Sequence, residues 1–269
     1  MKRLLISTVL TLKLISAGAM AAPSAKFAAV YGDGGPYVVS QITVEGTADA
    51  SAFDENDGYT FARIKVPQGK ELLVGVSAEV GLTTDTSIKG KNGGAAKAIA
   101  GAKGVVIVVA HRIGDCAPGD GDTCGAVAAP GDVTLNSRVQ ELNATLGGVI
   151  ESCTDGDLDG TIDISTDCLV TDEEIGLMLE TVSANHFNFV LPNLDQGEYN
   201  ITAYFTTRAD AAIDIDECTV GGDVEDGCAG GDGEVSARAF AKAFIGKYMV
   251  TVQQVRAVKG SILDVDIIE

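Results

Sequence analysis

Residues 187–202 have the sequence FNFVLPNLDQGEYNIT. The stretch from Phe187 to Leu191 is rich in aromatic and apolar residues, which predicts a strand. A corner follows, because Pro192 and Asp195-Gln196-Gly197 are turn signals. Alternation of polar and apolar residues then predicts a second strand from Glu198 to Thr207. The segment indicates two consecutive strands of an all-β fold.

This corner contains a Leu and a Gly and is followed at once by Tyr199, and it resembles the tyrosine corner of immunoglobulin-like sandwiches. In that arrangement the ring packs at the corner of the sheet, and its hydroxyl bonds back to the main chain. The resemblance implies an antiparallel immunoglobulin-like β-sandwich, with a jelly-roll-like variant as the alternative. It concerns the fold and implies no activity.

The rest of the chain repeats the same pattern of short alternating runs separated by glycine-containing turns. Such a pattern favours a sandwich. Further strands are predicted at residues 37–44, 59–66, 71–82, 104–113, 133–146, 175–182, 235–245, 248–258 and 262–267.

Two segments leave alternatives open. Thr171-Asp172-Glu173-Glu174 is a formal capping box, and the residues after it fit one helical face, so a short helix at 172–183 competes with the predicted strand. We favour the strand, because the segment leads directly into Phe187. Residues 90–104, rich in Gly, Ala and Lys, are expected to form a loop, an insertion or a weak helix.

The N-terminus has the layout of a cleaved signal peptide. Lys2 and Arg3 precede an apolar run, which Lys13 interrupts, and small residues follow up to Ala22. We expect cleavage after Ala21, and therefore a secreted or periplasmic/extracellular protein without a membrane span. The mature chain, 22–269, is predicted to be a single β-sandwich domain with acidic loop insertions at 114–132, 151–172 and 209–234.

The charge of the chain argues against nucleic acid and anionic membranes as partners. The formal net charge is −19, and removing Lys2, Arg3 and Lys13 with the signal peptide makes it −22. Such a surface repels phosphate groups. No Lys or Arg occurs between Arg138 and Arg208, an interval rich in Asp and Glu. Solvation, screening or a bound cation relieves repulsion of this kind.

Six cysteines suit an oxidising compartment, although 15 connectivities are possible. We favour pairing between nearest neighbours, because each pair brackets a Gly- and Asp-rich segment that cannot bury apolar surface. The spacings do not match a zinc site. The predicted disulfides are Cys116–Cys124, Cys153–Cys168 and Cys218–Cys228.

The segment between Cys153 and Cys168 resembles the first nine positions of an EF-hand or dockerin-type calcium loop. Carboxylates at positions one, three and five converge on the cation, Gly160 at position six allows the sharp turn, and position seven supplies a main-chain carbonyl. The resemblance implies calcium as the cofactor, with ligands from Asp155, Asp157, Asp159, Thr161 and Asp163.

The end of this loop departs from the resemblance. Position twelve, normally an acidic ligand, is Thr166. Asp167 lies one residue late and is the expected replacement, with Glu173 and Glu174 as alternatives. A solvated acidic turn without metal is the competing interpretation.

Signals of catalysis are weak. The two histidines, His111 and His186, are expected to be structural, and no nucleophile elbow, P-loop or zinc-protease motif occurs in the sequence. The pattern from Ile175 to Tyr199, with Gly246 to Val252, resembles uncharacterised secreted β-sandwich proteins of bacteria. We expect an exported non-enzymatic binding or structural surface protein whose partner is another protein, a glycan or a second copy of itself. A filament or matrix subunit and a carboxylate-dependent hydrolase are the alternatives.

Overall fold

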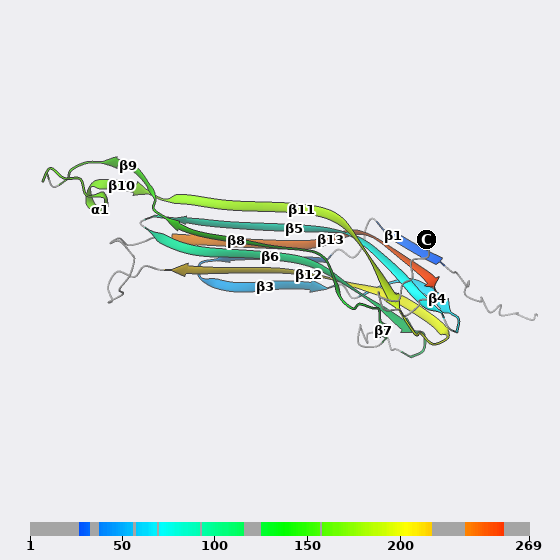
Figure 1. Ribbon diagram of the computed structural model, residues 1–269. Coiled ribbons are helices and arrows are strands. Elements are labelled where there is room, and N and C mark those ends of the chain that lie inside the picture. Colours follow the sequence, from blue (N-terminus) through cyan, green and yellow to red (C-terminus); the bar gives the residue numbers. More distant parts are fainter. Residues whose placement is uncertain are drawn as a thin grey trace, which may run out of the picture.

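The computed structural model describes residues 27–32, 38–55, 58–68, 70–91, 93–115, 125–156, 158–216 and 235–255. They form two large antiparallel sheets that pack face to face and a separate two-stranded hairpin, which confirms the predicted all-β sandwich. The molecule is an elongated rod (Figure 1), because five of its strands are 19 to 21 residues long. At about 3.3 Å per residue, such strands span roughly 65 Å.

The first sheet, sheet A, is centred on β5 (Glu71–Gly90). β5 pairs along its whole length with β13 (Val235–Val255) on one side and with β11 (Glu173–Leu191) on the other. The far side of β13 is shared by β2 (Val38–Glu45) and β1 (Phe27–Gly32). β11 is therefore an edge strand of sheet A.

The second sheet, sheet B, is centred on β6 (Gly94–Arg112) and β12 (Gly197–Asp216), which pair with each other. β3 (Ala48–Glu55) and β4 (Tyr59–Val66) share the free side of β12. β8 (Val133–Leu146) and the two-residue β7 (Ala126–Val127) share the free side of β6. β8 thus lies at the edge of sheet B, and its side chains reach β11 of sheet A.

The core changes character along the rod. Near the tyrosine corner large side chains such as Phe189, Phe205 and Ile64 are fully buried. Towards the other end the interior is built mainly from alanines, which allow the two sheets to approach closely. These alanines are Ala96, Ala98 and Ala100 of β6, Ala209 and Ala211 of β12, and Ala237, Ala239 and Ala241 of β13.

The alanine-rich interior corrects one prediction. Residues 94–104, part of the predicted loop or weak helix, belong to β6. Every second residue there faces the core and is small, so the segment lacks a strongly hydrophobic pattern. Its backbone amide and carbonyl groups are nevertheless hydrogen-bonded by the neighbouring strands of the sheet. Two further strands are longer than predicted: β12 continues to Asp216, inside the predicted insertion at 209–234, and β13 is continuous from Val235 to Val255.

The alternative helix at 172–183 is wrong. β11 runs without interruption from Glu173 to Leu191 and pairs with β5 at every position, and it unites the two strands predicted at 175–182 and 187–191. The neighbouring strand supplies hydrogen bonds throughout, which outweighs the local helix signal.

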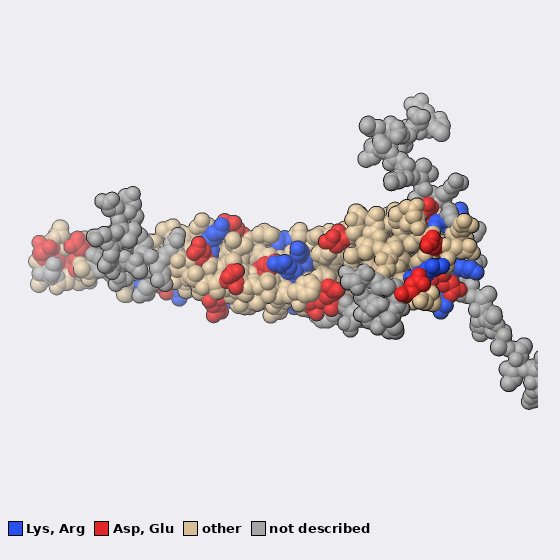
Figure 2. All heavy atoms as spheres, turned by 90° about the horizontal axis from the view of Figure 1, so that it is seen from below, with Lys and Arg blue, Asp and Glu red and all other residues tan. Residues whose placement is uncertain are grey.

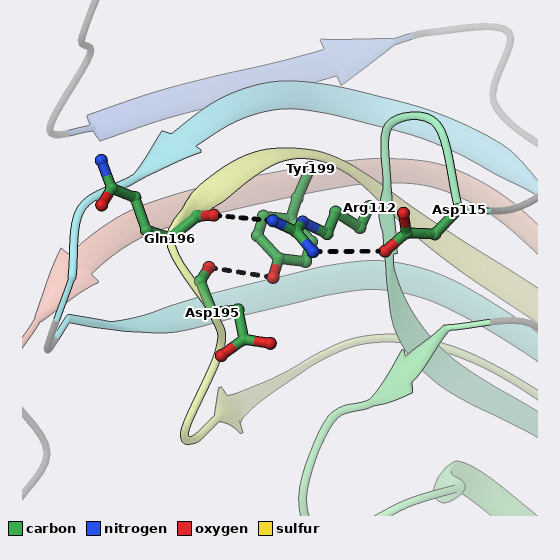
Figure 3. Close-up of polar contacts among 5 residues, drawn as sticks. All are labelled: Arg112, Asp115, Asp195, Gln196 and Tyr199. Carbon is green, nitrogen blue, oxygen red and sulfur yellow. Dashed lines mark hydrogen bonds and ion pairs between the residues drawn. The ribbon is translucent and has the colours of Figure 1, made fainter.

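The tyrosine corner is present (Figure 3). The Tyr199 hydroxyl donates a hydrogen bond to the Asp195 carbonyl oxygen over 2.9 Å, and the ring is buried. Arg112 spans the same corner: it donates to the Gln196 carbonyl over 3.0 Å and lies 3.5 Å from the Asp115 carboxylate. Burial raises the pKa of the Tyr199 phenol, and the Arg112 guanidinium opposes this increase.

Candidate functional site

The tip of the rod is a small hairpin beyond the two sheets (Figure 1). β9 (Val149–Cys153) and β10 (Cys168–Thr171) pair with each other, and a single helical turn, α1 (Ile164–Asp167), precedes β10. Cys153 and Cys168 are cross-strand partners and form a disulfide, which confirms this predicted bond. The other four predicted disulfide cysteines, Cys116, Cys124, Cys218 and Cys228, lie outside the described residues. Acidic side chains gather at this tip (Figure 2).

The disulfide closes the loop that resembles a calcium-binding loop, and Asp155 organises its first half. One oxygen, Asp155 Oδ2, accepts a hydrogen bond from the Gly160 amide over 3.0 Å. Gly160 has a φ of 88°, so the turn at position six uses the conformation that favours glycine. The second oxygen, Asp155 Oδ1, is shielded from solvent and has no hydrogen-bond partner among the described residues.

Asp159 and Thr161 form a local pair in the middle of the loop. The Asp159 Oδ1 atom accepts bonds from the Thr161 hydroxyl over 2.6 Å and from the Thr161 amide over 2.7 Å. These bonds, the hydroxyl's first, lower the pKa of Asp159 below its usual value. Both bonds favour the charged form of this carboxyl over the neutral form.

Asp167, rather than a glutamate, closes the loop. Its Oδ1 atom accepts from the Gly156 amide over 3.2 Å, and its Oδ2 atom accepts from the Asp163 amide over 2.9 Å. Glu173 and Glu174 instead begin β11 and pair with β5. Asp157, the predicted ligand at position three, lies outside the described residues, and within those residues no three acidic, His or Cys side chains converge as a metal site.

A second candidate site is the edge of sheet A beside β8. The side chains of Ile175, Leu177 and Leu179 lie on the inner face of β11, since their partners in β5 are the buried residues Ile88, Thr86 and Thr84. Nevertheless they remain 46%, 44% and 42% exposed, respectively. We call these three residues the β11 ladder. Sequence reasoning predicted the strand but not this exposure.

The β11 ladder is exposed because sheet B covers it only in part. Leu142 and Ala144 of β8 are only partly buried, and they pack against the core cluster that contains Ile88. Within the described strands β11 pairs with β5 alone, apart from one bridge between Val190 and Ala129 near its far end. The edge beside the ladder is open, and we call it the open edge.

A polar cluster holds β8 against β11 at this edge. Thr84 Oγ1 donates to Gln140 Oε1 over 2.9 Å, and Gln140 Nε2 donates to Thr86 Oγ1 over 2.8 Å and to the Leu177 carbonyl. Gln140 and both threonines are buried. The cluster fixes the spacing between the two sheets beside Leu177 and Leu179 of the ladder.

The two histidines lie on the outer faces of the sheets. His186 Nδ1 lies 2.8 Å from Ser77 Oγ of the neighbouring strand β5, and its Nε2 lies 3.1 Å from Asn188 Oδ1 on the same strand, β11. His111 Nε2 lies 3.2 Å from the Tyr204 hydroxyl. A hollow of about 520 Å³ on sheet B is lined by small residues such as Gly101 and Ala50, by Ile99 and Val139, and by the Arg208–Asp210 ion pair.

No helix in the described ranges combines the length and apolar character needed to cross a bilayer. The sequence matches no protein-family model and no curated protein.

Two solved structures of type III secretion assemblies from Salmonella align weakly with the chain. One is a near-atomic-resolution cryo-EM structure of the SPI-1 injectisome secretin InvG, with 10% identity over 70% of this chain and 67% of that one, and a TM-score of 0.11. The other, an atomic model of the basal body proteins InvG, PrgH and PrgK, has the same identity and TM-score. The chain covers 48% of the matched chain in that structure. Scores this low do not indicate a shared fold.

Proposed function

We propose that this chain is an exported, non-enzymatic structural surface protein whose copies associate through the open edge into an extracellular filament or matrix. The observation that carries the proposal is the β11 ladder: three consecutive inward-facing apolar side chains, each more than two fifths exposed, on an unpaired strand edge. The long sheets add a rod shape suited to a structural role (Figure 1).

An edge strand of this kind favours association through two physical effects. Its outward amide and carbonyl groups are available to another strand, and main-chain pairing supplies affinity. The exposed side chains of the ladder lose contact with water when a strand is added, and this burial of apolar surface contributes a favourable hydrophobic free energy to association. Exposed ion pairs elsewhere on the surface, such as Arg63–Glu198, Lys97–Glu141 and Arg208–Asp210, contribute little stability.

The test is the assembly state of the oxidised mature protein, residues 22–269. Sedimentation velocity and negative-stain imaging over a range of concentration and sodium chloride should reveal oligomers or filaments. Because the chain is strongly acidic, assembly should increase with salt as repulsion is screened.

A pair of matched substitutions connects assembly to the open edge. Leu177→Asp places a charge in the ladder and should abolish assembly, whereas Val139→Asp, on the outer face of β8, should leave it intact. A wild-type protein that stays monomeric under all these conditions contradicts the proposed function.

Calcium binding by the tip loop belongs to the same proposal. Asp155, Asp157, Asp159, the Thr161 carbonyl, Asp163 and Asp167 would hold the ion. The support comes from Asp155 Oδ1, a shielded carboxylate oxygen without a partner, which is the type of atom that calcium ligation satisfies. Bound calcium would offset the repulsion between these carboxylates and make the tip rigid.

Calorimetric titration with calcium tests this part separately. We expect heat of binding and an increase in melting temperature for the wild type. Both should vanish in an Asp155→Ala, Asp159→Ala variant and persist in Asp132→Ala, which removes an exposed carboxylate outside the loop. A wild type with neither response has no calcium site.

A further inference from the structure

We infer that the open edge receives a strand formed by residues 262–268 of a second copy, so that subunits join head to tail. The inference rests on the proposed function, because it names the partner segment for the association at that edge. Residues 262–268 have the sequence ILDVDII, for which alternation predicts a strand. They lie outside the described residues.

The segment matches the β11 ladder in pattern. Alternate residues of a strand share a face, so Leu263, Val265 and Ile267 form an apolar row of three, while the two aspartates between them belong to the opposite face. If Val265 lies opposite Leu177, this row continues the ladder and covers it. The aspartates then face solvent beside the outer surface of sheet A.

The segment cannot reach the open edge of its own subunit. Val255, the last described residue of β13, pairs with Glu71, whereas Leu177 pairs with Thr86. The fifteen residues of β5 between these points span about 50 Å. The ten residues from Val255 to Val265 extend over at most about 36 Å. An intact β13 therefore excludes insertion in cis.

This geometry also sets the direction of assembly. β13 ends at the end of the rod that carries the tyrosine corner, and the β11 ladder lies next to the tip hairpin at the other end (Figure 1). A segment that continues from Val255 can enter the open edge of a neighbouring rod placed end to end. Because the two surfaces differ, each added subunit offers a new open edge, and the chain of subunits does not close.

Charge disfavours the simplest competitor, pairing of β11 with β11 of another copy. The antiparallel register that aligns two ladders around Leu177 places Glu174 directly opposite Glu180 at two positions, and like charges opposite each other destabilise a sheet. With Val265 opposite Leu177, Ile262 and Ile268 stand opposite these glutamates in either strand direction. The tail segment therefore places no charge directly opposite either glutamate.

Cross-linking of two variants tests the partner directly. Residue 177 and residue 265 are central in their rows, so a Leu177→Cys subunit mixed with a Val265→Cys subunit should form a disulfide across the joint, whichever way the strand runs. Peptide mapping should find the 177–265 link in the mixture alone. A 177–177 link in the Leu177→Cys protein by itself, or the absence of any link at 177, overturns the inference.

Substitutions in the segment give a second readout. Leu263→Ser, Val265→Ser and Ile267→Ser together should raise the concentration needed for assembly about tenfold or more, because three apolar contacts are lost. The pair Ile262→Ser and Ile268→Ser changes the opposite face and should have a much smaller effect. Melting temperatures of the monomers serve as the control for folding.

The outcomes separate this inference from the proposed function. If Leu177→Asp blocks assembly while the triple variant assembles like the wild type, the open edge is the interface but residues 262–268 are not its partner. If the wild type does not assemble at all, both fail. A synthetic peptide of residues 257–269, added in excess, should inhibit assembly only if the inference is correct.

Discussion

The buried amide of Gln140 offers the sharpest test of how the two sheets are held at the open edge. In a Gln140→Met variant the side chain keeps its length and shape, but the hydroxyls of Thr84 and Thr86 lose the partners that they have at 2.9 and 2.8 Å. Both threonines are completely buried, so water does not replace the amide. Each orphaned hydroxyl costs about 1 to 3 kcal/mol. The variant should lose about 4 kcal/mol of unfolding free energy in total.

Removing the whole polar cluster should restore most of this loss. A triple variant, Gln140→Met with Thr84→Val and Thr86→Val, leaves no unpaired hydroxyl and keeps the side-chain volumes, and such replacements are nearly neutral. Urea denaturation of the oxidised monomer measures all the variants in a cycle. The reasoning is refuted if the single substitution costs less than about 1 kcal/mol, or if the triple variant is no more stable than the single one.

Three smaller predictions concern other parts of the rod. Tyr199→Phe removes the hydrogen bond at the corner and should lower the unfolding free energy by about 1 kcal/mol, with no change in assembly; a larger loss would mean that the hydroxyl has more than one role. Gly81→Ala places a Cβ in collision with the ring of Phe244 and should lower the melting temperature, whereas Gly101→Ala, with its closest contact at 3.8 Å, should not; equal effects would contradict the packing. Thr161→Val removes the hydroxyl hydrogen bond to Asp159, which lowers the pKa of that carboxyl more than the amide hydrogen bond does. The pKa should therefore rise towards its usual value in an NMR titration. Because the folded-state pKa is lowered, its stabilising effect is present above the unfolded pKa and disappears as the pH falls through the folded value.

The sequence predicts the strands best where turn residues bound a clear alternation. The structure confirms the strands at 59–66 and 133–146 with their predicted limits. The first half of β6 and all of β3 escaped prediction, because their inward residues are mostly alanines and a row of alanines carries little hydrophobic contrast. These segments form strands because they pair with long neighbouring strands, and their local sequence pattern contributes little.

The candidate sites were predictable to different degrees. The spacing of acidic residues and cysteines in the sequence predicts the tip loop. Cys153 and Cys168 form a disulfide because they are direct partners on the two strands of the hairpin. The open edge was not predictable from local sequence. Ile175, Leu177 and Leu179 are ordinary core residues by pattern, and their exposure depends on where β8 ends its contact with β11.

An acidic surface and an exposed apolar ladder are compatible if association has to be selective. Glu174 and Glu180 flank the ladder on its strand, and charges at such positions are a common protection of sheet edges against indiscriminate pairing. They oppose any added strand that carries an acidic residue opposite either of them, including β11 itself in the aligned register. A strand with apolar residues at these two positions and at the ladder escapes the penalty. The same glutamates that keep separate rods apart would then select the one segment that joins them.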